Sequence, residues 1–176
     1  MHHQREEAIL LEEAQLRSGG AFVAGLGEKV DYFASAVHEG PRGFSRLRAT
    51  GVALEGGYAV ARGVAKIDKR GEWSNTLFEG GVILLGEGAR GYSAPMLEIG
   101  TGNVEEARHE ALGSKPDEET IFYLQTRGLS KVEAWRIIVY GAIEHQLDFL
   151  EGWVREAAEE KSIKILNTKL KDVKTF

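Results

Sequence analysis

Residues 46–68 read RLRATGVALEGGYAVARGVAKID, and this stretch decides the fold. Short runs of Ala, Val, Leu and Tyr are interrupted by glycine every few residues, and no segment keeps an apolar helical period for three turns. Strands bounded by tight glycine turns are typical of this pattern. The same pattern extends from Gly20 to about Ala107, with Pro41 and Pro95 as its only prolines. We therefore predict a mainly β protein.

The crowding of glycine at the corners favours a β-solenoid, in which each turn of chain stacks on the one before it. A sandwich or a barrel would also contain short strands at this spacing. No clean sequence repeat is visible, so periodicity by itself favours the solenoid only weakly.

Helices are expected on both sides of this β region. Residues 5–17 place Ile9, Leu10 and Leu16 near one face and are followed by two glycines, which predicts a short N-terminal helix. After Pro116, acidic residues in a first turn and a capping box of Ser130 with Glu133 predict a helical segment. The three helices expected there cover residues 119–126, 131–140 and about 143–160. The predicted organisation is an N-terminal helix at 1–18, a β core at 19–115 and a helical segment at 116–176.

Composition limits the classes of function. The 176 residues are 43% hydrophobic and 28% charged, with a net charge of −5 and no cysteine. The absence of cysteine excludes a disulfide framework, a thiolate zinc site and a cysteine nucleophile. Net acidity disfavours duplex nucleic acid as a partner, and the basic stretch at 161–174 is interpreted as a solvated terminal segment. With no secretory leader pattern and no membrane-length apolar run, we expect a cytoplasmic protein that does not enter a membrane.

Residues 86–91 (GEGARG) match the glycine spacing of a dinucleotide-binding loop. That motif requires a helix to begin at its third glycine. Here an extended pattern containing Pro95 follows, so we interpret the segment as a turn.

Two histidine positions are candidates for chemistry. His109 is followed by Glu110, and imidazole with carboxylate suits metal ligation or proton transfer, although no second ligand lies at metal-binding spacing. His38 is expected at a strand end, where a surface or core role is the more common one. A small metal enzyme would need His38, His109 and Glu110 to lie together.

An ordered set of short motifs adds a resemblance. The segments in order are HEA at 109–111, DEE at 117–119, IFYL at 121–124, RGLS at 127–130 and EA at 133–134. Upstream segments follow the same order, with VHEGP at 37–41, GVAKI at 63–67, LLG at 84–86 and PMLEI at 95–99. Over about residues 37–147 the chain resembles the SufB/SufD family of iron-sulfur cluster assembly proteins.

The resemblance implies a right-handed parallel β-helix core with C-terminal helices, and a role in assembly without enzymatic activity of its own. It implies a homodimer or a heterodimer with a SufB-like chain, and a SufC-like ABC ATPase as a further partner. By position it places His109 and Glu110 at a cluster or metal site and His38 as a weaker candidate. The residues implied in docking the ATPase are Phe122, Tyr123, Leu124, Arg127, Gly128 and Trp135.

The chain departs from the family pattern where SufB proteins carry a cysteine, because about Gly80 occupies that position. Thiolate is the usual ligand of iron-sulfur clusters. The resemblance therefore implies a SufD-like role, no resident cofactor in this chain alone and a transient iron-sulfur cluster formed with a partner chain. The alternative is a β-solenoid interaction module, or a paralogue without cluster chemistry.

Overall fold

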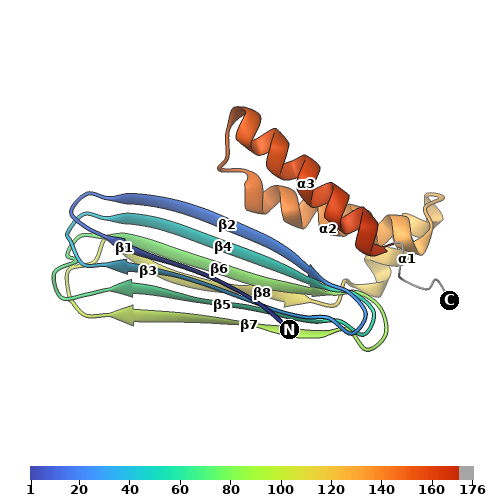
Figure 1. Ribbon diagram of the computed structural model, residues 1–176, viewed down its shortest axis with the longest axis horizontal. Coiled ribbons are helices and arrows are strands. Elements are labelled where there is room, and N and C mark those ends of the chain that lie inside the picture. Colours follow the sequence, from blue (N-terminus) through green and yellow to red (C-terminus); the bar gives the residue numbers. More distant parts are fainter. Residues whose placement is uncertain (171–176) are drawn as a thin grey trace.

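The computed structural model describes residues 1–170, which form eight strands followed by three helices (Figure 1). The strands are β1 (His2–Leu10), β2 (Gln15–Ala24), β3 (Lys29–His38), β4 (Phe44–Ala53), β5 (Tyr58–Ile67), β6 (Asn75–Leu84), β7 (Arg90–Ile99) and β8 (Glu106–Ser114). The helices are α1 (Glu118–Thr126), α2 (Lys131–Leu147) and α3 (Gly152–Leu170).

The strands form two parallel sheets. Sheet A has the order β1-β3-β5-β7 and sheet B the order β2-β4-β6-β8, so each turn of chain adds one strand to each sheet. Residues in neighbouring turns therefore lie in register, as Ser45 does with Thr76, 31 residues later. This arrangement is a parallel β-helix of four turns, and the predicted core fold is confirmed.

The predicted N-terminal helix is wrong, because residues 2–10 and 15–24 are the strands β1 and β2. Glu6, Ala8 and Leu10 alternate with exposed side chains and pair with β3 along its length. Pairing with the edge of β3 outweighs the modest helix preference of a Glu- and Leu-rich segment. The chain reverses between the two strands at Glu13, which has a φ of 56°.

Side chains that point between the sheets fill the interior of the solenoid. Alanine is the commonest of them, and the larger members include Tyr32, Leu47 and Phe78, each at most 2% exposed. Gly63 makes room for Phe78, because a Cβ at position 63 would lie 2.0 Å from its ring. The narrow interior thus requires mostly small residues, which explains why the strands of the solenoid are rich in Ala and Gly.

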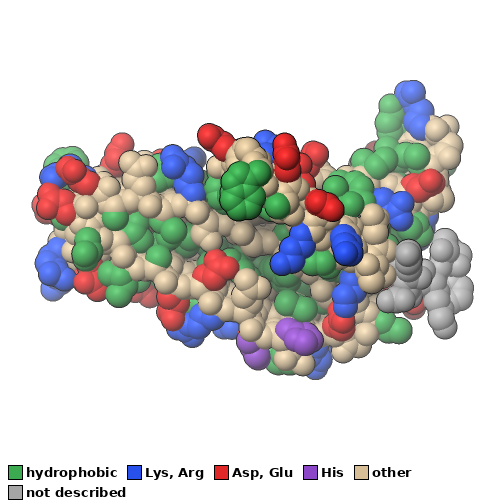
Figure 2. Space-filling model, turned by 45° about the horizontal axis from the view of Figure 1, so that its top comes forward, with side chains coloured by type: hydrophobic (Ala, Val, Ile, Leu, Met, Phe, Trp, Pro, Cys, Tyr) green, Lys and Arg blue, Asp and Glu red, His purple; other side chains and the backbone are tan. Residues whose placement is uncertain are grey.

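The helices pack on the outer face of sheet B, whereas no helix of residues 1–170 covers sheet A (Figure 1). The apolar cluster between them joins Val52, Leu54 and Leu85 of the solenoid to the buried faces of the helices, including Val139 and Leu166. On the face shown in Figure 2, acidic and basic side chains are interspersed. Within residues 1–170, no helix is both long and apolar enough to cross a membrane.

The predicted helix ends are confirmed in part. The capping box of Ser130 and Glu133 forms, and Gly128 ends the α1 segment with a φ of 91°. However, α2 continues to Leu147 and α3 begins only at Gly152. Ile143 extends the buried face of α2 and is only 5% exposed, so packing on sheet B carries the helix past the expected stop.

Two further segments test the sequence interpretation. The glycine-rich segment at 86–91 forms a turn with positive φ at Gly86 and Gly88, as predicted, and its last two residues already belong to β7, which begins at Arg90. The interpretation of residues 161–170 as a solvated segment is wrong, because α3 includes them and buries Leu166 and Leu170 against the cluster. The remainder of that basic stretch, 171–174, lies outside the described residues.

Candidate functional site at the last turn of the solenoid

The last turn of the solenoid, formed by β7 and β8, has a neighbouring strand on one side only. β7 pairs with β5 and β8 with β6, so each of the two strands has a free edge among the described residues. His109 pairs with Phe78, which pairs with Leu47, and the three side chains occupy one inward-facing column. Leu47 and Phe78 are buried, whereas His109 is exposed because no further turn covers it.

Glu110 belongs to the opposite face of the strand. It pairs with Glu79, whose side chain points outward toward the helices, and successive residues of a strand point to opposite faces. His109 and Glu110 therefore do not converge on one point within this chain. Residues 1–170 contain no group of three or more His, Cys, Asp or Glu side chains placed to hold a metal ion.

His38 lies in the interior at the end of β3. It is fully buried, and its Nε2 atom lies 2.8 Å from the Ser45 hydroxyl, which in turn lies 2.7 Å from the Thr76 hydroxyl. Burial lowers the pKa of His38 to about 4, so the ring is neutral at pH 7. Its Nδ1 atom has no hydrogen-bond partner in the described part of the chain.

The structure does not bring His38 and His109 together. His38 belongs to the second turn and His109 to the fourth, and neighbouring strands of a sheet are roughly 4.8 Å apart, so the two lie about 10 Å apart along the solenoid. Metal–nitrogen bonds are about 2 Å long. A metal enzyme built on His38, His109 and Glu110 is therefore not supported.

Five of the six residues expected to dock a partner divide into an exposed and a buried group. Phe122 and Tyr123 are 68% and 54% exposed on α1, and Arg127 donates a 2.9 Å hydrogen bond to the Tyr123 hydroxyl. Leu124 and Trp135 instead pack in the apolar cluster beneath the helices. The sixth residue, Gly128, contributes a backbone conformation rather than a contact surface.

Two cavities lie near this end of the molecule. One of about 160 Å³ is lined by residues of β6, β7 and β8, among them Val82, Ser93, Ala111 and Gly113. The Ser93 hydroxyl is buried and has no partner among the described residues. The other, of about 660 Å³, lies between the turn after β6 and the starts of α1 and α2, and Ile121, Lys131 and Trp135 line part of it.

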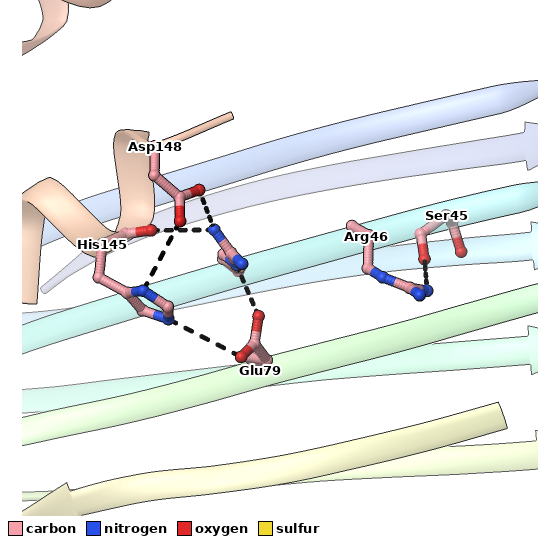
Figure 3. A network of polar contacts seen from close by, with 6 residues as sticks. Ser45, Arg46, Glu79, His145 and Asp148 are labelled. Atoms are coloured by element: carbon pink, nitrogen blue, oxygen red, sulfur yellow. Dashed lines mark hydrogen bonds and ion pairs between the residues drawn. The ribbon is translucent and has the colours of Figure 1, made fainter. Parts of the chain in front are cut away.

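A polar network that joins sheet B to α2 was not anticipated from the sequence (Figure 3). Arg48 donates a 2.6 Å hydrogen bond to Glu79, a 2.9 Å hydrogen bond to the carbonyl of His145 and a further one to Asp148. The His145 ring lies 3.8 Å from Glu79. Arg48 and Glu79 are 31 residues apart, and only the solenoid register places them side by side.

Comparison with known proteins adds to this geometry. Residues 2–142 match the family model described as the SUF system FeS cluster assembly, SufBD core domain. An iron-sulfur cluster assembly SufBD family protein of Staphylococcus saprophyticus is 31% identical over 121 residues, which is 69% of this chain and 26% of the relative. The iron-sulfur cluster assembly protein SufB of Bacillus subtilis is 31% identical over 122 residues, again 69% and 26% of the two chains. The chain thus spans about a quarter of the length of these relatives.

Proposed function

Because this chain belongs to the SufBD family of the iron-sulfur cluster assembly system, we propose that it acts as a non-enzymatic assembly component whose last turn contributes to a cluster-building interface. The cluster is its cargo and is built together with a partner chain. The observation that carries the proposal is the exposed His109 on the free edge strand of a SufBD core.

Association through the last turn is part of this proposal. The free edges of β7 and β8 offer unpaired backbone groups, and such edges readily pair with another chain. Pro95 lies in β7 and removes one donor there, whereas β8 contains no proline and keeps all of its donors. β8 is therefore the better strand for pairing with a second copy or with a SufB-like chain.

Within that interface, His109 is the residue proposed to meet the cluster. Its imidazole can bind iron, as histidine does in some iron-sulfur centres. Since this chain has no cysteine, the thiolates must come from the partner chain. Glu110 points the other way and is proposed to act from the outer face of β8, beside Glu79.

A SufC-like ABC ATPase is the proposed partner for the helical segment. Phe122 and Tyr123 are large, exposed and adjacent on α1, and aromatic side chains of this kind often anchor protein interfaces. Trp135 is proposed to support this surface from beneath, because it packs in the cluster under α1 and α2.

Co-elution with the ATPase of the same organism, with and without nucleotide, tests the docking. The double variant F122A/Y123A should abolish a complex that the unmodified chain forms. Trp153→Ala is the matched control, because Trp153 is an aromatic residue that is 77% exposed on α3 rather than α1. Loss of the complex in both variants, or in neither, would contradict the proposed docking surface.

A second candidate function is protein interaction without cluster chemistry. It is favoured by the absence of cysteine and by the opposite directions of His109 and Glu110. The two functions differ in iron uptake under anaerobic conditions. A chain that binds the ATPase but takes up no iron with any cysteine-bearing family partner would be an interaction module.

A further inference from the structure

One column of residues runs across the outer face of sheet B and ends at Glu110. The strand registers place Gly19, Arg48, Glu79 and Glu110 side by side on β2, β4, β6 and β8. The first three of these positions lie beneath the C-terminal end of α2, and the fourth is the candidate site residue.

The first position lets the helix end approach the sheet closely. A Cβ at Gly19 would lie 2.8 Å from the carbonyl oxygen of Gln146 and 2.9 Å from the ring of Phe149. Any side chain there would therefore push the end of α2 away from β2. The glycine sets how near the helix end lies to the column.

The second position makes the strongest polar connection. The Arg48 guanidinium donates to Glu79 on β6 and, on the helix side, to the His145 carbonyl and the Asp148 carboxylate (Figure 3). The side chains of Arg48 and Glu79 are only 18% and 10% exposed, so water screens this pair weakly. Hydrogen bonds between charged groups are about twice as strong as neutral ones.

The neighbouring Arg46 shows that this connection is specific. It lies on the same face of β4, but it donates to Asn75 and Glu106, which belong to β6 and β8. Figure 3 shows its additional hydrogen bond to the carbonyl of Ser45 on β4. Arg46 therefore joins strands to strands, whereas Arg48 joins strands to a helix. His145 of α2 also faces Glu79, with its ring 3.8 Å away, and belongs to the same network as Arg48. Outside that network, the ion pair between a helix and the solenoid in residues 1–170 is Lys169 with Glu28, where α3 meets the turn before β3.

We propose that Arg48 couples the position of α2 to the net charge beside Glu110. Its hydrogen bonds to Glu79, to the His145 carbonyl and to Asp148 are called the latch below. This inference rests on the proposed function, in which a partner acts on the helices and the last turn receives the cluster. While the latch is closed, Arg48 neutralises Glu79. When α2 is displaced, Arg48 loses its two helix-side acceptors and becomes free to leave Glu79.

The consequence falls on the last turn. Glu79 and Glu110 lie on neighbouring strands, and directly paired side chains on adjacent strands are about 5 Å apart. Without Arg48 they form two like charges at close range, which repel each other and attract a cation. Arg48 is thus a positioning residue, through which a displacement of the helices changes the charge presented next to the site.

Hydrogen exchange of the full chain, measured without any partner, tests the latch itself. In Arg48→Gln, the amides of residues 143–147 should exchange about tenfold to a hundredfold faster, the range expected when charged hydrogen bonds are lost. Arg46→Gln is the matched control and should leave those amides at the original rates. Lys169→Gln should accelerate the end of α3 and leave residues 143–147 unaffected. Arg48→Lys, which keeps the charge but loses the planar fork, should fall between the original chain and Arg48→Gln.

Unchanged exchange at residues 143–147 in Arg48→Gln, or equal acceleration in Arg46→Gln, would overturn the latch.

A second experiment adds the ATPase and measures hydrogen exchange at the amides of residues 106–114. Binding should change their exchange in the original chain and in Arg46→Gln, but not in Arg48→Gln. If the ATPase does not bind at all, the proposed function fails, while the partner-free result still decides whether the latch exists. If it binds and Arg48→Gln responds like the original chain, the coupling to the last turn is refuted.

Discussion

His38 and His109 are both carried by strands of the solenoid and both point toward its interior, yet their surroundings differ completely. His38 lies in the second turn, is fully buried and joins a chain of hydroxyl groups through Ser45 and Thr76. His109 lies on the last strand and is exposed, and its ring has no hydrogen-bond or ion-pair partner among the described side chains. The position along the solenoid, rather than the residue type, separates a core histidine from one that is free to bind.

The opposite end of the solenoid sharpens this contrast. In the first turn, the inward-facing Glu6 accepts hydrogen bonds of 2.9 Å from Tyr32 and 2.8 Å from Ser18. Burial raises the pKa of the Tyr32 hydroxyl above its usual range, so this hydroxyl remains a donor. An inward-pointing charge is one of the devices that discourage edge-to-edge pairing. In the last turn, Pro95 occupies the position equivalent to Glu6, and β8 directs His109 and Ala111 inward, so no charged carboxylate lies at that position.

The largest effect is expected at Phe78, which occupies the same inward-facing column as His109 but is covered by the last turn. Phe78→Ala should lower the free energy of unfolding by about 3–5 kcal/mol, because the ring is fully buried and a cavity would remain. Urea denaturation followed by tryptophan fluorescence measures the change. A loss below about 1 kcal/mol would mean that the interior is not packed around this ring.

The second prediction concerns pH. An unfolded histidine has a pKa of about 6.5, and the folded value for His38 is about 4, so the unfolded state binds the proton first as the pH falls. Stability due to His38 is complete above pH 6.5 and declines toward pH 4, by about 3 kcal/mol in total.

Urea titrations at several pH values between 7 and 4 measure this decline. In His38→Gln the free energy of unfolding should depend less steeply on pH, because the unfolded state no longer binds the one extra proton at residue 38. This holds whatever the stability of the variant at pH 7. An unchanged slope would show that His38 takes up its proton equally in the folded and unfolded states, which would contradict a buried, neutral His38.

A smaller loss is expected from Ser45→Ala, because the hydroxyl lies between His38 and Thr76. Removing it leaves two buried polar groups short of a partner, which costs roughly 1–3 kcal/mol. Ser18→Ala is a useful reference, since Ser18 bonds to the half-buried Glu6 in the first turn and should cost less. Equal losses in the free energy of unfolding would show that a hydroxyl buried inside the solenoid contributes no more than a half-buried one in its first turn.

The smallest effect is predicted at the candidate site itself. His109→Ala should change the free energy of unfolding by no more than about 0.5 kcal/mol, because the side chain is exposed and lacks partners. Thermal unfolding of the variant measures this directly. A loss comparable with that of Ser45→Ala would show a structural role for His109 and weaken its assignment as a binding residue.

Much of the fold could be predicted from the sequence, because glycine-bounded strands and helix caps are local signals. The strand register was not visible, because the offset between paired residues varies from 28 to 32 and inward positions require only small or apolar side chains, which many residues supply. The N-terminal helix was mispredicted because β1 depends on pairing with β3, which no local pattern records.

Part of the candidate site could be proposed from the sequence. The motif order pointed to His109, Phe122 and Tyr123; the structure exposes all three, and their roles stay predictions. The opposite directions of His109 and Glu110 follow from strand alternation once β8 is known. The Arg48 network could not be predicted, because its members come from two strands and a helix end that only the folded chain brings together.

The most direct test of the central claim is anaerobic cluster reconstitution of this chain with a cysteine-bearing family partner, followed by absorption of the assembled cluster. The account predicts that His109→Ala greatly reduces cluster formation while the fold and the association with the partner remain intact. His38→Gln, judged per folded molecule, should support cluster formation as well as the unmodified chain. Full cluster yield with His109→Ala would contradict the claim that the last turn presents His109 to the cluster.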